Sequence, residues 1–144
     1  MQLSEHFTLE ELTTSEAAAR QGLSNEPTGE ALENLKRLAE FLEDVRALVG
    51  KPIRINSAYR SPEVNAAVGG SKTSQHCFGC AADIRVPGMT PDEVVRAITA
   101  SNLEYDQCIR EFDSWTHVSI PNKEDAKPRK MALIIDKQGT RGFA

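Results

Sequence analysis

An apolar stripe is the clearest pattern along this chain. Between residues 32 and 49, leucine and valine recur at three- and four-residue steps, the spacing that places side chains on one face of an α-helix. Gly50 follows the stripe and supplies a helix end. We therefore predict a long helix that starts after residues 25–28, ends at Gly50 and has an apolar face made of Leu32, Leu35, Leu38, Leu42, Val45 and Val49.

Two other segments carry the signature of a helix start. Thr8 can cap a helix, and Glu11 follows three residues later, as a capping box requires. We expect this first helix to end near Gly22. Thr90 and Glu93 repeat the same spacing and precede apolar residues at 94, 95 and 98, which predicts a later helix.

The second half of the chain has the alternation typical of strands. Apolar and polar residues alternate at 52–57 and at 82–86. Residues 108–111 and 115–120 predict two strands of a hairpin, with a tight turn around Asp113 and Ser114. An apolar run at 131–135 predicts a last strand. Because helices come mostly first and the later strands are expected to be antiparallel, we predict an α+β fold: a small antiparallel sheet with helices packed on one face.

Composition sets the protein class. The chain has 144 residues, 40% hydrophobic and 26% charged, as is ordinary for a globular protein, and we expect residues 1–144 to form one domain. Its net charge of −4 and its lack of a lysine and arginine cluster argue against nucleic-acid binding. No apolar run approaches the ~20 residues that span a bilayer, so no membrane partner is expected.

The first residues and the cysteines bear on the compartment. The N-terminus has neither a basic start nor an apolar stretch, so we expect no secretory signal and a cytoplasmic protein unless something releases it. Three cysteines make an odd, sparse set that favours a reducing compartment over a disulfide framework. Cys77 and Cys80 form a CxxC, but no second paired motif accompanies it, so we interpret both as packing residues.

Two short stretches hold the candidate chemistry. Residues 74–83 include His76 and Asp83, and residues 115–119 include His117. Three ligands of these types plus one open position for water are what a hydrolytic zinc site requires. Strand alternation places Asp83 and His117 opposite the core-facing Ile84 and Val118. Spacing alone leaves open that the three are ordinary surface or core residues.

The chain also resembles a known family. A Tyr-Arg-Ser segment at 57–65, a Val-Gly-Gly at 68–70, the Ser-x-His-x-x-Gly-x-Ala-x-Asp box at 74–83 and Trp-x-His-Val-Ser at 115–119 occur in the order seen in VanY-like zinc peptidases. These are the D-Ala-D-Ala carboxypeptidases and the phage L-alanyl-D-glutamate endopeptidases, which cut peptidoglycan stem peptides. Their fold is similar to the hedgehog signalling domain. The resemblance covers nearly the whole chain.

The resemblance implies roles for individual residues. By that likeness His76, Asp83 and His117 bind one catalytic Zn²⁺. Arg60 resembles the family arginine near the substrate, which can steady the developing oxyanion or bind a substrate carboxylate. The alternative for Arg60 is an ion pair that fixes its loop. Ser74 either hydrogen-bonds substrate or caps the loop that carries His76.

The general base is where this chain departs from the family. In related enzymes an acidic residue just before the last histidine ligand takes that role, but Ser114 occupies the place three residues before His117. Some relatives carry a second histidine where this chain has Trp115. We favour Glu111, expected almost across from His117, over Asp113, which is expected in the turn. The alternative for Glu111 is a cross-strand salt bridge.

These features imply a function. The resemblance implies a zinc metallopeptidase that hydrolyses amide bonds in peptidoglycan stem peptides, either as a carboxypeptidase or as an endopeptidase. A chain without a secretory signal fits a monomeric phage or prophage endolysin that reaches the wall through a separate pore. The alternatives are a non-catalytic zinc-bearing module that binds the cell wall and a phage structural part that opens the wall during entry.

Overall fold

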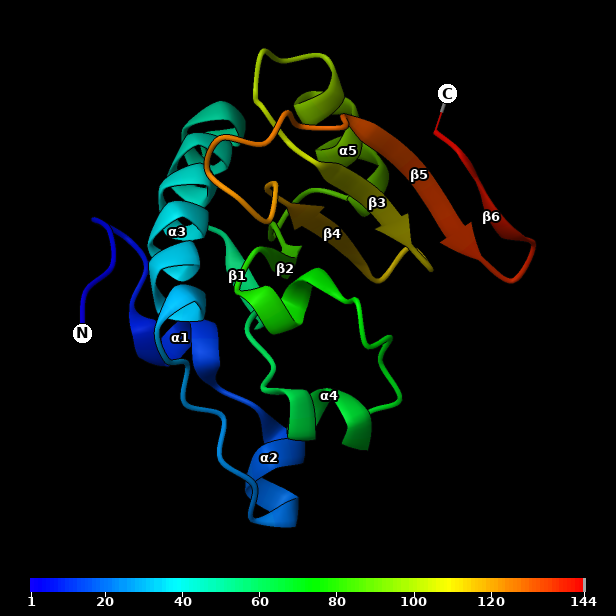
Figure 1. Ribbon diagram of the computed structural model, residues 1–144. Coiled ribbons are helices and arrows are strands. Elements are labelled where there is room, and N and C mark those ends of the chain that lie inside the picture. The colour runs from blue at the N-terminus through cyan, green and yellow to red at the C-terminus, as the bar shows by residue number, and fades with distance from the viewer. Residues whose placement is uncertain (144) are drawn as a thin grey trace.

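The computed structural model describes residues 1–143, and a six-stranded sheet is its central element (Figure 1). Helix α3 (Glu30–Val49) and helix α5 (Pro91–Thr99) pack together on one face of the sheet, and α5 lies behind β3 and β4 in the view of Figure 1. The predicted α+β class is confirmed. Among the residues described, no helix combines the length and the apolar character needed to cross a bilayer.

The N-terminal segment forms two short helices where one was expected. These are α1 (Leu9–Thr13) and α2 (Glu16–Gln21). The capping box of Thr8 and Glu11 is present, but Thr14 and Ser15 adopt extended backbone conformations that break the helix. Ser15 then caps a new helix, because its side chain accepts a hydrogen bond from the Ala18 backbone N–H at 3.1 Å.

The other predicted helices are confirmed. Helix α3 ends at Gly50 in the left-handed conformation, with φ 67°. Helix α5 begins with the capping box of Thr90 and Glu93. Two short elements for which nothing was predicted, α4 (Pro62–Ala67) and the 3₁₀ helix η1 (Gln75–Phe78), lie between the first two strands.

The sheet has the order β1-β2-β4-β3-β5-β6. Its strands are β1 (Arg54–Ser57), β2 (Ala81–Arg85), β3 (Gln107–Glu111), β4 (Trp115–Ser119), β5 (Met131–Asp136) and β6 (Gly139–Gly142). Neighbouring strands are antiparallel except β3 and β5, which are parallel. The expectation that all later strands are antiparallel was therefore wrong for β5, and β6 was not predicted.

A crossover explains the parallel pair. Residues 120–130 lead from the end of β4 back to the beginning of β3, where Asp106 is buried. The backbone N–H of Met131 donates to the Asp106 carbonyl at 2.9 Å, and the Arg129 guanidinium pairs with the Asp106 carboxylate at 2.7 Å. Strand β5 thus starts beside the start of β3 and must run in the same direction.

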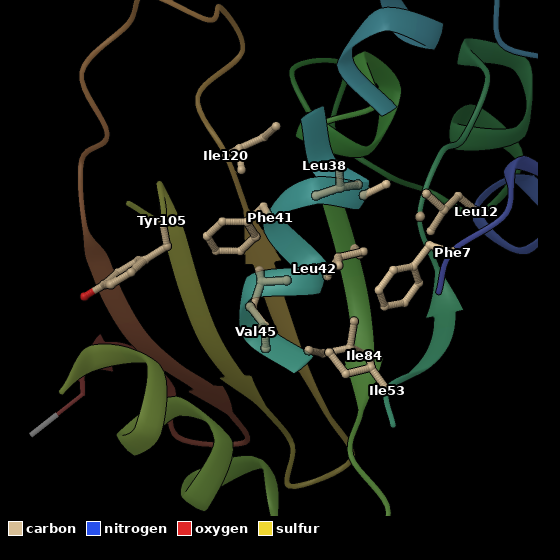
Figure 2. Packing of buried hydrophobic residues seen from close by; sticks show 14 of the residues in the cluster. Phe7, Leu12, Leu38, Phe41, Leu42, Val45, Ile53, Ile84, Tyr105 and Ile120 are labelled. Carbon is tan, nitrogen blue, oxygen red and sulfur yellow. The ribbon is translucent and has the colours of Figure 1, made fainter. Parts of the chain in front are cut away.

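The core lies between α3 and one face of the sheet. Leu42 and Val45 of α3 pack near Ile84 of β2 (Figure 2), and all three side chains are fully buried. Val118 of β4 belongs to the same buried cluster. The predicted alternation is therefore confirmed, and Asp83 and His117 occupy alternate positions on the opposite face of the sheet.

Candidate active site

Three potential metal ligands meet on the face of the sheet away from α3. One ligand atom from each of His76, Asp83 and His117 lies within 4.8 Å of the others. Asp83 and His117 are directly opposite each other on β2 and β4, where side chains of a pair lie side by side. His76 reaches the pair from η1. The structure thus brings together the three residues singled out in the sequence.

Local backbone chemistry places His76. The Ser74 hydroxyl caps η1 by accepting a hydrogen bond from the His76 backbone N–H at 3.2 Å, which is the capping role considered for it. Gly79 ends η1 with φ 77°, and a Cβ there would lie 2.6 Å from the Ala31 carbonyl oxygen. Only glycine fits this close approach to α3, so the Gly of the sequence box holds the His76 turn against the helix.

The tautomer of His76 follows from its partner. Its Nδ1 lies 2.6 Å from the Ala58 carbonyl oxygen, which can only accept a hydrogen bond. Nδ1 must therefore carry the proton, and Nε2 keeps a lone pair that faces Asp83 Oδ1 at 3.4 Å. A backbone carbonyl that fixes the second ring nitrogen is the usual outer support of a metal-binding histidine.

Asp83 stays ionised between the two imidazoles. Its Oδ1 is 3.0 Å from His117 Nδ1, and the rings of His76 and His117 lie 5.2 Å apart. Burial by itself raises the pKa of Asp83, but the hydrogen bond with His117 and the close approach of the two imidazoles outweigh it and hold that pKa well below its usual range. Two imidazoles and one carboxylate are ligands that zinc accepts, and three of them leave a coordination position open.

A cleft of about 560 Å³ surrounds these residues. The segment between β1 and β2 forms one wall, β3 and β4 form the floor, and β5 with the residue stretch before it forms the other wall. The side chains that line the cleft beside the three ligands include Arg60, Ser74, Gln75, Gln107, Ile109, Glu111, Trp115, Arg129, Leu133 and Ile135.

The hairpin register differs from the one expected. Glu111 pairs with Trp115, and His117 pairs with Ile109. The expectation that Glu111 lies almost across from His117 was therefore wrong by two residues. Glu111 still faces the cleft, because residues two apart on a strand share a face.

The position of the turn explains this difference in hairpin register. Its two central residues are Phe112 and Asp113, with φ of 52° and 54°, one position earlier than expected. Ser114 closes the turn, since its backbone N–H donates to the Glu111 carbonyl at 2.9 Å. Asp113 is exposed, pairs with Arg110 at 3.2 Å and does not line the cleft. The geometry therefore favours Glu111 over Asp113 as the acid beside the ligands.

Glu111 is held and shielded within the cleft. The Trp115 indole Nε1–H donates to Glu111 Oε2 at 3.1 Å. Burial raises the pKa of Glu111, and the nearby Asp83 charge raises it further, against smaller opposing effects of His117 and the indole bond. Within residues 1–143 Glu111 forms no ion pair, so the cross-strand salt bridge considered for it is not found.

Arg60 brings an uncompensated positive charge to the cleft. Its guanidinium Nη2 lies 3.4 Å from Ser74 Oγ, and its Nε is buried without a partner. In the part of the chain that the structure describes, no acidic group pairs with it, so the ion pair considered as its alternative role is absent. A buried donor without a partner in a cleft is positioned for an anionic or carbonyl oxygen of a ligand.

Several cleft residues were not anticipated from the sequence. Ile109 and Leu133 are neighbours on β3 and β5, and Ile135 lies beside Glu111. Strand alternation within 107–111 was available as a signal for the β3 residues. The β5 residues depend on the parallel pairing, which local sequence does not reveal.

The three cysteines lie outside the metal group. All are free thiols, and Cys80 and Cys108 are fully buried. Burial raises the pKa of Cys80 to about 11 and that of Cys108 to about 12. Both thiols are therefore protonated at neutral pH, which fits packing rather than metal binding or redox chemistry.

Comparison with known families agrees with this site. A model of the peptidase M15 family matches residues 5–119, which include the three ligands, Arg60 and Glu111. The chain therefore belongs to the peptidase M15 family, and it is a peptidase. Members of this family are typically zinc-dependent. No curated protein matches the chain. Strands β5 and β6 lie beyond the matched range.

Proposed function

We propose that this protein is a zinc metallopeptidase that hydrolyses an amide bond in peptidoglycan stem peptides. The observation that carries the proposal is the convergence of His76, Asp83 and His117 beside Glu111 in one cleft, within the part of the chain matched by the family. The motif order shared with VanY-like peptidases supports the choice of stem peptides as substrate.

His76, Asp83 and His117 would hold the ion. A bound zinc ion supplies Lewis-acid polarisation of the scissile carbonyl and lowers the pKa of water at the site. Two features of the site suit zinc binding. The Ala58 carbonyl fixes His76 Nε2 as the ligand atom, and Asp83 is ionised.

Glu111 acts as general base and then as general acid. Its carboxylate takes a proton from the attacking water as the oxygen adds to the carbonyl carbon, and returns that proton to the amide nitrogen as the C–N bond breaks. The products are a carboxylate and an amine. A pKa raised by burial and by the Asp83 charge suits a carboxyl that must both accept and release a proton.

Arg60 stabilises negative charge. The carbonyl oxygen gains charge as water adds, and a guanidinium without an acidic partner in the cleft can hydrogen-bond to it or to a carboxylate of the stem peptide. Ser74 contributes by ordering both His76 and Arg60 through its hydroxyl.

The proposed cellular role rests on the same resemblance to VanY-like peptidases. We propose that the protein acts as a monomeric phage or prophage endolysin, made in the cytoplasm and active on the wall after release, with no nucleic-acid or membrane partner. The bond that it hydrolyses is either the terminal D-Ala-D-Ala amide or the L-Ala-D-Glu amide. The products separate these two, because the first releases free D-alanine and the second separates stem fragments.

Digestion of purified peptidoglycan, followed by mass spectrometry of the fragments, tests the proposal. The wild type with zinc should cleave one type of stem amide. His117→Ala and Glu111→Ala should not cleave it, and an exposed control, Glu104→Ala, should retain full activity. A zinc-loaded wild type that leaves peptidoglycan intact at high dose would overturn the proposal and favour a non-catalytic wall-binding module.

A further inference from the structure

Two arginines face each other across the first two strands. Arg54 of β1 and Arg85 of β2 are directly opposite in the antiparallel register, and both are exposed. Within residues 1–143 neither forms an ion pair or a side-chain hydrogen bond. Like charges directly opposite on a sheet destabilise it, so this pair carries a cost that nothing in the described chain offsets.

A third basic group lies close to the same place. A Cβ built on Gly88 would fall 2.9 Å from Lys51 Nζ, so the ammonium rests against the turn that follows β2. Lys51 likewise has no acidic partner among the described residues. Three unpaired positive charges therefore gather at one end of the sheet in a protein whose net charge is −4.

Arg54 and Arg85 border a pocket of about 420 Å³. The stretch that follows β2, including Gly88 and Met89, lines the same pocket. Asp113 also lines it, but its carboxylate is engaged by Arg110 at 3.2 Å. The pocket shares no lining residue with the metal cleft, although Asp83 lies only two residues before Arg85 on the same strand.

We propose that the Arg54–Arg85 pair at the edge of this pocket binds an oxyanion, a phosphate or a carboxylate, through its two guanidinium groups. An oxyanion with two or more oxygens can be shared by two guanidinium groups, which removes their mutual repulsion and forms charge-assisted hydrogen bonds. Phosphodiesters of anionic wall polymers and carboxylates of wall peptides both offer this chemistry. The site does not depend on the peptidase activity, and it is tested without zinc or peptidoglycan.

Anion titration tests the site. The Nε–Hε NMR signals of Arg54 and Arg85 are followed in the wild type during addition of potassium phosphate or potassium acetate, with potassium chloride holding the ionic strength constant. We expect saturable shifts of both signals. Arg85→Gln should weaken the affinity about tenfold or more, as loss of a charge-assisted hydrogen bond predicts. The control Arg20→Gln, which removes an exposed charge on α2, should bind as the wild type does. The anion that binds more tightly identifies the source, phosphate ester or carboxylate.

Urea unfolding provides a second measurement, in which Arg85→Gln should increase stability although it weakens anion binding. In chloride alone Arg85→Gln should unfold at a higher urea concentration than the wild type, because the repulsion is gone. In the tighter-binding anion the wild type should gain stability and the variant should not. The proposal is overturned by non-saturable shifts, by an equal loss of affinity in Arg20→Gln, or by an Arg85→Gln variant that is no more stable than the wild type in chloride.

Discussion

The indole of Trp115 donates a hydrogen bond to one carboxylate oxygen of Glu111, with 3.1 Å between Nε1 and Oε2. The two residues are directly opposite on β3 and β4, one on each side of the turn that joins these strands. One oxygen of Glu111 is thus held at the rim of the cleft. Within the described residues the other oxygen has no hydrogen-bond partner, which leaves it available to a water molecule beside the three ligands.

Trp115→Phe tests whether this bond orients the base. The substitution keeps an aromatic ring but removes the N–H donor. We expect kcat to fall about tenfold, as for loss of a hydrogen bond to a charged group worth about 1.5 kcal/mol, with KM and zinc content little changed. Steady-state kinetics on a stem-peptide substrate, together with metal analysis, provides the measurement. Unchanged kcat would show that Glu111 needs no support from the indole.

Paired isosteric variants separate the two candidate bases. Glu111→Gln removes the proton acceptor and should reduce kcat about 10²- to 10⁴-fold. Asp113→Asn changes an exposed turn residue that pairs with Arg110, and it should retain nearly full activity. Both proteins should hold zinc as the wild type does. Loss of activity in the Asp113 variant alone would transfer the role of base to that residue.

The protonation of Glu111 can be followed without catalysis. The chain has one tryptophan, Trp115, so intrinsic fluorescence reports on the residue that touches Glu111. In zinc-free protein we expect a fluorescence transition above the ordinary glutamate pKa of ~4.3, because burial and Asp83 favour the protonated form. Zinc should move the transition to lower pH, since a nearby cation favours the carboxylate.

Glu111→Gln is the control for that titration. It should abolish the transition while leaving any change caused by the histidines. A zinc-free wild type whose transition lies at or below the ordinary glutamate pKa would contradict the environment assigned to this carboxyl.

Asp106 anchors the crossover that brings β5 into the cleft. It is buried, and it accepts hydrogen bonds from the backbone and side chain of Arg129 and from Gln75. Asp106→Asn should lower the free energy of unfolding by about 1–3 kcal/mol. This loss is smaller than that expected for a fully buried ion pair, because the Arg129 side chain is 54% exposed to solvent. Urea denaturation, with the exposed Asp125→Asn as control, measures the loss.

The pH dependence of that loss has a defined sign. Burial raises the pKa of Asp106, but the bonds from Arg129 outweigh it and lower the pKa in the folded protein. The stabilisation is therefore complete above the unfolded-state pKa of ~3.9 and disappears as the pH falls through the lower folded-state value. The difference between wild type and Asp106→Asn should shrink over that acidic range. A difference that grows on acidification would contradict the assignment.

Much of the fold was accessible from local patterns. Helix α3 was predictable because its apolar stripe and Gly50 reflect the same helical geometry that the structure shows. The position of Asp83 and His117 on one face followed from strand alternation. In contrast, the break at Thr14 and Ser15 was not predictable from the capping signal of Thr8, because a capping box fixes where a helix begins and not where it ends.

The other wrong predictions arise from one long-range contact and from one unusual turn conformation. The parallel alignment of β5 with β3 depends on Arg129 docking on Asp106, a contact between residues 23 positions apart. The register of Glu111 depends on Phe112 adopting a positive φ, which an aromatic residue rarely does. Local sequence carries no signal for either event. The β5 wall of the cleft and the position of the general base, Glu111, were therefore the least predictable parts of the site.

In the proposed function, His76, Asp83 and His117 together hold one zinc ion. The direct measurement is the zinc content per folded chain after dialysis against a low zinc concentration, for wild type, Glu111→Gln and His117→Ala, with circular dichroism to confirm folding. We expect one zinc per chain in the first two proteins and none in the third. A folded wild type without zinc, or a His117→Ala variant that keeps a full equivalent, would contradict this proposal.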